Sequence, residues 1–204
     1  MAKTGLLIDM KCKPGRDDDV EAMLRDVLPM AREDPATQAW IAVRFARERY
    51  GIFGEFADGT ARETHLRGPL VRALKGHKGD LFSRAPELHK IDIVEDVVKP
   101  NHELQDSKGF LLTFRPRPGR EADLEKYLRE QHPFVFEDPR TSAWFAVRLD
   151  DGSYGIFDIF PDSERVQELT GMVPNDLARH AGALLRGTPK LDMLTIAAEK
   201  LPTT

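Results

Sequence analysis

Hydrophobic and polar residues alternate with a period of two over residues 5–13, so that Leu6 and Ile8 share one side. Such alternation is typical of a half-buried β-strand. From Asp17 the apolar spacing changes to three and four residues, which predicts a helix that Pro29 should kink or end. The pattern therefore predicts a strand followed by a helix at the start of the chain.

The pattern then returns to strands. Residues 37–45 and 49–56 predict two strands that pair antiparallel across a short turn. A short helical turn around residues 61–66 precedes a helix face over residues 70–82, and residues 91–98 form a last strand. The order βαββαβ predicts a ferredoxin-like unit, a four-stranded antiparallel sheet with both helices on one face.

The second half of the chain repeats the first at a shift of about 104 residues. Two copies of this length indicate a duplicated domain and not a solenoid, which needs shorter and more numerous units. We expect one domain over residues 1–98, a polar linker over 99–107 and a second domain over 108–204. The paired motifs are Pro14-Gly15-Arg16 with Pro118-Gly119-Arg120, Glu33-Asp34-Pro35 with Glu137-Asp138-Pro139, and Tyr50-Gly51-Ile52-Phe53 with Tyr154-Gly155-Ile156-Phe157.

Composition narrows the class of protein. The 204 residues carry a formal net charge of -4 with no basic tail, which argues against a nucleic-acid partner because phosphate neutralisation needs Lys and Arg. No apolar run is long enough for a signal peptide or a membrane span, so we expect no membrane partner. Cys12 is the single cysteine, which excludes an intramolecular disulfide and favours a cytoplasmic location.

Two chemical constellations recur in both copies. The period of two places Trp40, Ala42 and Arg44 on one face of a strand, and Trp144 and Arg148 repeat the pattern. An aromatic ring and a guanidinium beside a small Ala are suited to frame a pocket for a planar, electron-rich ligand. The same residues also suit a buried Trp and a salt-bridged Arg in a purely structural role. Both interpretations stay open.

The second helix of each copy carries a histidine on its apolar face, His77 in the first copy and His180 in the second. A buried neutral imidazole is a proton acceptor or a ligand to a haem iron, although most such histidines are hydrogen-bonded core residues. His65 has Leu169 as its counterpart, so any role of His65 belongs to one copy. Asp92 and Asp192, in the last strands of the two copies, are each expected to form a structural ion pair with an inward Arg.

Motifs for common cofactors are missing from the sequence. No His and carboxylate spacing is typical of zinc, and no Gly-rich loop follows a strand as in phosphate-binding folds. We therefore expect no metal or nucleotide cofactor.

Each half resembles the antibiotic biosynthesis monooxygenase domain of the dimeric α+β barrel superfamily. The resemblance covers nearly the whole chain and implies an α+β fold, in which two tandem ferredoxin-like βαββαβ units form an intramolecular dimeric α+β barrel. The chain would then be a monomeric pseudo-dimer or pair again as a homodimer. The motifs that carry the resemblance are Pro14-Gly15-Arg16, the stretch Thr37 to Arg44 with its copy Thr141 to Arg148, Tyr50-Gly51-Ile52-Phe53 with its copy, and Ala57-Asp58 leading to His65-Leu66.

The resemblance implies a cofactor-independent monooxygenase that acts on a small electron-rich aromatic of the quinol or polyketide class. The substrate would lose a proton, pass an electron to O2 and collapse through a peroxide to a quinone. Arg44 and Arg148 would stabilise the anion, and His77 and His180 would move protons. The implied substrate contacts are Trp40, Trp144, Phe53, Phe157, Tyr50 and Tyr154.

Two alternatives remain beside the oxygenase. Haem-degrading relatives use a helix histidine as the iron ligand, a role for which His77 and His180 are placed. The second alternative is a non-catalytic protein that holds a small hydrophobic ligand between sheet and helices.

Overall fold

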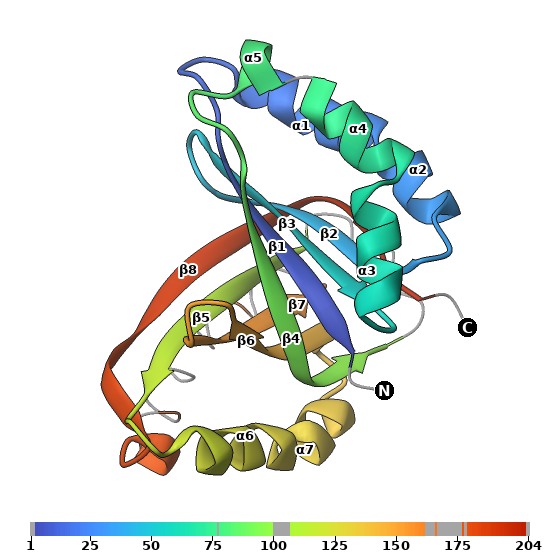
Figure 1. The fold of residues 1–204 in the computed structure, drawn as a ribbon. Helices are drawn as coiled ribbons and strands as arrows, with labels where there is room; N and C mark the ends of the chain where they lie inside the picture. The colour runs from blue at the N-terminus through green and yellow to red at the C-terminus, as the bar shows by residue number, and fades with distance from the viewer. Residues whose placement is uncertain are drawn as a thin grey trace. The chain divides into compact units, whose positions relative to one another are not determined.

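The structure is a computed structural model that describes residues 3–76, 78–99, 107–161, 166, 177 and 179–202. The expected order of strands and helices is present in the first copy (Figure 1). Its elements are β1 (Thr4–Lys11), α1 (Asp17–Asp26), α2 (Leu28–Glu33), β2 (Thr37–Ala46), β3 (Arg49–Phe56), α3 (Gly59–Leu66), α4 (Pro69–Gly76), α5 (Lys78–Leu81) and β4 (Glu87–Val98).

The second copy follows the same order as far as it is described. Most of the segment that corresponds to α3, α4 and α5 lies outside the described residues, as do residues 100–106 of the expected linker. The elements are β5 (Lys108–Pro116), α6 (Glu121–Glu130), α7 (His132–Glu137), β6 (Ala143–Leu149), β7 (Tyr154–Phe160) and β8 (Leu185–Lys200).

Pro29 acts as the sequence predicts. Helix α1 ends at Asp26, and α2 starts anew at Leu28 with Pro29 in its first turn, where a missing backbone N–H leaves no hydrogen bond unmade. Asp17, Asp18 and Asp19 occupy the first turn of α1, where the positive end of the helix dipole favours acidic side chains.

Strand pairing places the residues of each face. In the first copy, β3 pairs antiparallel with both β1 and β2, so that Ile52 lies between Ile8 and Ala42. In the second copy, β7 pairs antiparallel with β5 and β6 in the same manner. The hairpin between β6 and β7 turns at Gly152, whose φ of 77° is easily adopted only without a Cβ.

The last strand of each copy is shared between two compact units. Unit 1 comprises Met1–Ile91 with Thr195–Pro202, and unit 2 contains Asp92–Leu194. Thus β4 begins in unit 1 and ends in unit 2, whereas β8 begins in unit 2 and ends in unit 1. In unit 1 the end of β8 pairs antiparallel with β2, with Trp40 opposite Lys200 and Arg44 opposite Thr195.

The hydrogen-bonded strand order, β1-β3-β2-β8-β5-β7-β6-β4, closes on itself. Two tandem βαββαβ copies with this closed strand order are the fold that the resemblance to the dimeric α+β barrel implies, and the expected fold class is confirmed. None of the helices in the described part of the chain is long and apolar enough to cross a membrane.

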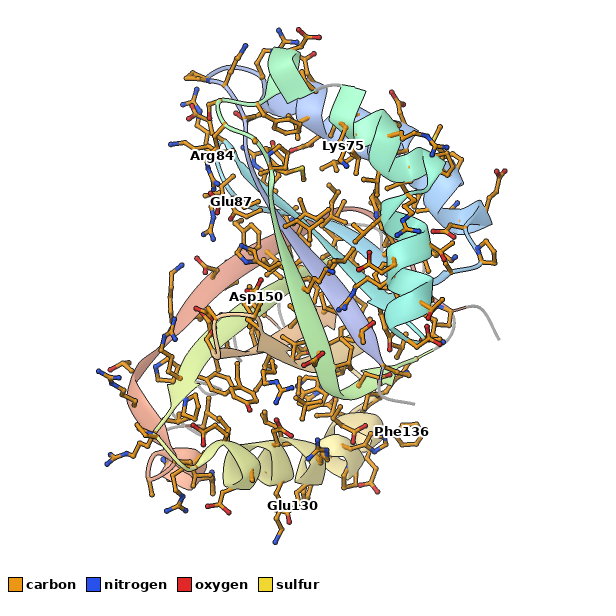
Figure 2. All side chains as sticks on the ribbon, in the orientation of Figure 1. Lys75, Arg84, Glu87, Glu130, Phe136 and Asp150 are labelled. Atoms are coloured by element: carbon orange, nitrogen blue, oxygen red, sulfur yellow. The ribbon has the colours of Figure 1, made fainter. Side chains whose placement is uncertain are left out.

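Each unit has its own core on the helix-bearing face of its sheet. In unit 1 this core joins Met10, Trp40 and Ile52 to Leu24 of α1 and Val71 of α4. In unit 2 the corresponding cluster includes Trp144, Tyr154 and Leu128. By contrast, Phe136 lies on the outer side of α7 with 61% of its surface exposed (Figure 2).

Candidate functional site

The two tryptophans lie in the cores of their units. Trp40 is fully buried and Trp144 is 3% exposed, each packed with side chains from the helices that cover its sheet. Ala42 is also fully buried and belongs to the same cluster as Trp40. Among the described residues, the Trp40 Nε1 atom is buried without a hydrogen-bond partner. Trp40 therefore keeps an unused donor inside an apolar core.

Arg44 and Tyr50 meet carboxylates of α1. Arg44 Nη1 lies 3.1 Å from Glu21 Oε1, and its Nη2 lies 3.5 Å from Asp17 Oδ1. The Tyr50 hydroxyl donates to Asp17 Oδ1 at 2.9 Å. Burial, and then this hydrogen bond, raise the pKa of Tyr50 far above its ordinary value. The guanidinium is thus paired within its own unit before any ligand arrives.

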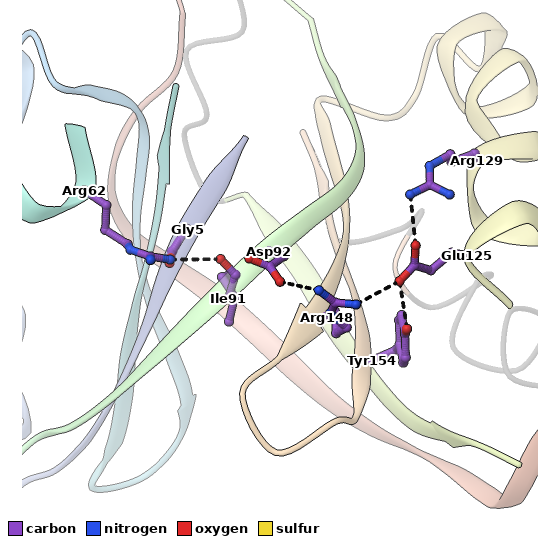
Figure 3. Close-up of polar contacts among 8 residues, drawn as sticks. All are labelled: Gly5, Arg62, Ile91, Asp92, Glu125, Arg129, Arg148 and Tyr154. Atoms are coloured by element: carbon purple, nitrogen blue, oxygen red, sulfur yellow. Dashed lines mark hydrogen bonds and ion pairs between the residues drawn. The ribbon is translucent and has the colours of Figure 1, made fainter. Parts of the chain in front are cut away.

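The second copy repeats this arrangement (Figure 3). Arg148 lies between Glu125 at 3.3 Å and Asp92 at 2.7 Å, so Asp92 pairs with an Arg as expected, but both side chains are exposed and the Arg is not inward. Asp192 lies 2.8 Å from Lys190 Nζ. The Tyr154 hydroxyl donates to Glu125 Oε1 at 2.9 Å, and Arg129 also contacts Glu125 at 3.0 Å. Burial, and then the bond to Glu125, raise the pKa of Tyr154 to about 12. A substrate anion would have to compete with these carboxylates for either Arg.

Phe53 and Phe157 lie on the other face of their sheets. Phe53 pairs with Leu7 and Ile41 in register, one residue away from the positions that face the helices. Phe157 packs on Phe145 with ring centroids 6.5 Å apart. The structure does not bring these two phenylalanines to the face that carries the tryptophans.

Of the two helix histidines, the structure describes only His180. His77 lies outside the described residues. His180 is exposed, so the expectation that it lies on a buried helix face was wrong. The buried positions are Leu177 and Ala181, four residues apart, and His180 is one residue, about 100° of helix rotation, away from Ala181.

His65, which has no histidine counterpart in the second copy, has a well-defined hydrogen-bond partner. It lies near the end of α3 and is 4% exposed, and its Nδ1 is 2.7 Å from Asp34 Oδ2. Thr37 donates from Oγ1 to Asp34 Oδ2 at 2.8 Å, and its Oγ1 is 3.0 Å from His65 Nδ1. The only sequence signal was indirect: Asp34 and Thr37 recur as Asp138 and Thr141, whereas His65 does not recur.

Asp34 is held in its ionised form. Burial alone would raise the pKa of this carboxyl, but hydrogen bonds from His65, Thr37 and the Ala36 backbone N–H lower it below its usual range. Lys200 Nζ also donates to the Asp34 carbonyl oxygen at 2.8 Å, and burial lowers the pKa of Lys200. A persistent negative charge therefore lies against the imidazole.

Two cavities of unit 1 are lined by described residues of its helices. One, of about 290 Å³, is apolar except for Lys75, which lies exposed on α4 (Figure 2). The other, of about 320 Å³, contains the Asp34–His65 pair. The first is lined by Ile8, Met10, Val71, Leu74, Lys75, Phe82, Pro86 and Leu88. The second is lined by Met30, Glu33, Asp34, Pro35, Thr64, His65, Gly68, Pro69 and Leu70.

The described part of the chain contains no group of three or more His, Cys, Asp or Glu side chains placed to hold a metal ion. This statement covers neither His77 nor the other residues outside the described ranges.

Comparison with known proteins supports the fold. No protein-family model matches the chain, and no curated protein does. A solved structure of a proposed monooxygenase from Fusobacterium nucleatum is 11% identical, covers 99% of this chain and 95% of its own, and superposes with a TM-score of 0.84. A proposed monooxygenase from Lactobacillus acidophilus is 5% identical over 100% of this chain and 98% of its own, with a TM-score of 0.83.

An anthrone oxidase-like protein is 12% identical, covers 98% of this chain and 92% of its own, and has a TM-score of 0.66. At these identities the likeness concerns the fold. The fold that the resemblance implies is confirmed over the whole length of the chain.

Proposed function

We propose that the protein is a cofactor-independent monooxygenase that acts on a small electron-rich aromatic of the quinol or polyketide class. The observation that carries the proposal is the apolar cavity of about 290 Å³ between β1 and α4 of unit 1. Its volume is close to the lower end of small-molecule pockets, about 300 Å³, and suits a compact ring system. The names of the similar structures, proposed monooxygenases and an anthrone oxidase-like protein, support the reaction class.

The walls of this cavity suit the implied chemistry. Five of its lining residues belong to the same core cluster as Trp40, so the cavity borders the apolar core of unit 1. Lys75 is the one charged side chain among the lining residues, and it stabilises an aromatic anion from the exposed side.

The reaction needs no electron source besides the substrate. An anthrone that has lost a proton passes one electron to O2, and the resulting radical and superoxide combine into a peroxide at the ring carbon. The peroxide takes up a proton, and the ring carbon then loses its remaining hydrogen as a proton while the O–O bond breaks. This leaves a carbonyl on that carbon, and the outer oxygen leaves as hydroxide, which combines with a proton to give water. The apolar walls contribute by excluding bulk water, which strengthens the interaction between Lys75 and the anion.

A non-catalytic ligand-binding protein is the second candidate. It is favoured by one observation: the described residues that line the apolar cavity include no histidine and no carboxylate, the usual proton acceptors. No observation on the described residues favours haem, because His180 is exposed and His77 lies outside them.

Oxygen uptake tests the proposal. Chelator-treated protein without flavin is expected to consume O2 with at least one member of a panel of hydroquinones and anthrones, and to form the corresponding quinone. Leu74→Trp, which fills the cavity, should lower kcat/KM by about tenfold or more. Lys75→Met should lower it as well, and the exposed Lys126→Met in unit 2 is the matched control that should leave it unchanged.

The panel also separates the two candidates. Absence of uptake together with saturable binding of an anthrone, lost in Leu74→Trp, would replace the oxygenase by the binding protein. Thermal unfolding of each variant verifies that a lost activity does not reflect a lost fold.

A further inference from the structure

The second cavity of unit 1 contains chemistry that the apolar cavity lacks. His65 is held from several sides: Asp34 and Thr37 contact its Nδ1, and the Phe56 ring lies with its centroid 4.9 Å from the imidazole centroid. Its helix α3 is anchored in turn, because Arg62 Nη1 donates to the carbonyl oxygens of Gly5 and Ile91, each at 3.4 Å (Figure 3). The imidazole therefore has a fixed orientation.

The contacts at Nδ1 decide which nitrogen is available. An ionised carboxylate only accepts hydrogen bonds, so Asp34 requires the proton of a neutral His65 on Nδ1. The other nitrogen, Nε2, then carries a lone pair, and among the described residues the hydrogen bonds of His65 are all at Nδ1. A neutral imidazole oriented by a half-buried carboxylate, as His65 is by Asp34, can accept a proton and stabilise the resulting imidazolium.

The lining of the cavity defines the ligand. His65, Asp34 and Glu33 line it together with Met30, Pro69 and other uncharged residues, and neither Lys nor Arg is among them. An anion would enter a site that already contains two carboxylates, whereas an uncharged molecule with an acidic O–H finds a proton acceptor. The volume of about 320 Å³ again suits a compact ring.

This site differs from the apolar cavity, because the two share no lining residue. Helix α4 contributes to both cavities: its first residues, Pro69 and Leu70, line the His65 cavity, and Val71, Leu74 and Lys75 line the apolar one. A ligand in one cavity can therefore be distinguished from a ligand in the other by mutation.

In the second copy, Asp138 is the counterpart of Asp34 and has a different hydrogen-bond partner. Asp138 binds Arg140, with Nε 2.9 Å from Oδ1 and Nη2 3.1 Å from Oδ2. The first copy has Ala36 at the position of Arg140, which leaves Asp34 available to His65. Leu169, the counterpart of His65, lies outside the described residues, and a leucine supplies no proton acceptor in any position.

We propose that Thr37, Asp34 and His65 form a proton-accepting site, present in unit 1 alone, for a small uncharged hydroxyl compound of the phenol class. The phenolic O–H bond breaks as an N–H bond forms at His65 Nε2. The negative charge stays on the phenolate oxygen, and the imidazolium lies between it and Asp34. The site operates whether or not the oxygenase reaction takes place in the apolar cavity.

Ionisation of 4-nitrophenol tests this site, because the phenolate absorbs visible light and the phenol does not. Bound to the wild-type protein at a pH below its own pKa, the probe is expected to show a ratio of phenolate to phenol about tenfold higher than in buffer. His65→Gln should abolish the increase and Asp34→Asn should reduce it, while Leu74→Trp in the apolar cavity and Asp138→Asn in the second copy should leave it unchanged.

Histidine ¹⁵N NMR of the wild-type protein keeps the test decisive if His65→Gln does not fold. One histidine should show a protonated Nδ1 and an unprotonated Nε2, and its Nε2 should become protonated as the probe ionises. An equal phenolate ratio in His65→Gln and wild type, loss of the effect in Leu74→Trp, or no histidine that responds to the probe would each overturn the proposal.

Discussion

Asp34 and Asp138 hold equivalent positions in the two copies but have different partners. The first binds His65 and lies beside a cavity, and the second binds Arg140. Both backbone carbonyls accept a hydrogen bond from a lysine, Lys200 and Lys99 respectively. The lysine contact is the same in both copies, whereas two sequence differences, His65 against Leu169 and Ala36 against Arg140, change what the acid can bind.

The tyrosines at the ends of the hairpins allow a prediction at the same scale. Tyr154→Phe should lower the free energy of unfolding at pH 7 by about 1 to 2 kcal/mol, because it removes a buried hydrogen bond to the Glu125 carboxylate. Urea unfolding measures this loss. A double-mutant cycle with Glu125→Gln should show that most of the loss is coupling between these two side chains.

The pH dependence of that effect follows from the raised pKa of Tyr154. A group whose pKa is higher in the folded state stabilises fully below its unfolded value, about 10 for tyrosine, and its contribution is lost as the pH rises toward about 12. The difference between wild type and Tyr154→Phe should therefore shrink from pH 10 upward. A difference that stays constant from pH 7 to pH 12 would contradict this assignment.

At the scale of elements, the first strand of each copy carries a glycine where another strand approaches closely. A Cβ on Gly5 would lie 2.7 Å from the Gly54 carbonyl oxygen, and a Cβ on Gly109 would lie 2.3 Å from that of Asp158. The repeat aligns these two glycines, and the contact explains them physically: the neighbouring backbone leaves no room for a methyl group.

Substitution of Gly109 tests this packing constraint. Gly109→Ala should lower the free energy of unfolding by about 2 kcal/mol or more, because backbone atoms of β7 must shift to admit the Cβ. Gly59→Ala, where a Cβ meets nothing within 4 Å, is the matched control and should change stability by less than about 0.5 kcal/mol. Equal effects of the two substitutions in urea unfolding would show that close approach is not the cause.

At the scale of the whole molecule, each copy of the repeat lacks part of the unit to which it contributes. Unit 1 includes Thr195–Pro202 from the end of the chain, where β8 pairs with β2. Unit 2 includes the part of β4 that follows Ile91. A unit of structure is therefore not identical to a unit of sequence.

Separation of the two copies as fragments tests whether each unit needs the strand that the other copy contributes. A fragment of residues 1–99 lacks the strand that pairs with Trp40 to Arg44, so β2 is left with an unpaired edge. We expect this fragment to self-associate or unfold, and mixing it with residues 107–204 to give a one-to-one complex with the circular dichroism of the intact chain. Size-exclusion chromatography with light scattering measures both outcomes. A folded monomer of either fragment would contradict the expectation.

Much of the fold was predictable from local signals. Alternation gave β1 to β3, the proline marked the break between α1 and α2, and the repeat marked the duplication. The site was less predictable. The period of two correctly placed Trp40 and Ala42 on one face of their strand, but the role of Phe53 was inferred from a shared motif although Phe53 lies on the other face. The expected burial of His180 was wrong because the buried stripe of its segment passes through Ala181.

The sequence by itself determined the duplication, the order of the elements and the apolar face of most of them, because each of these depends on periodicities within about a dozen neighbouring residues. Only the tertiary structure decided which distant side chains meet. His65 and Asp34 are separated by 31 positions, on a helix and in a loop whose patterns predict no contact between them. Their pairing depends on how β2, β3 and α3 pack, and packing brings together residues that no local pattern relates.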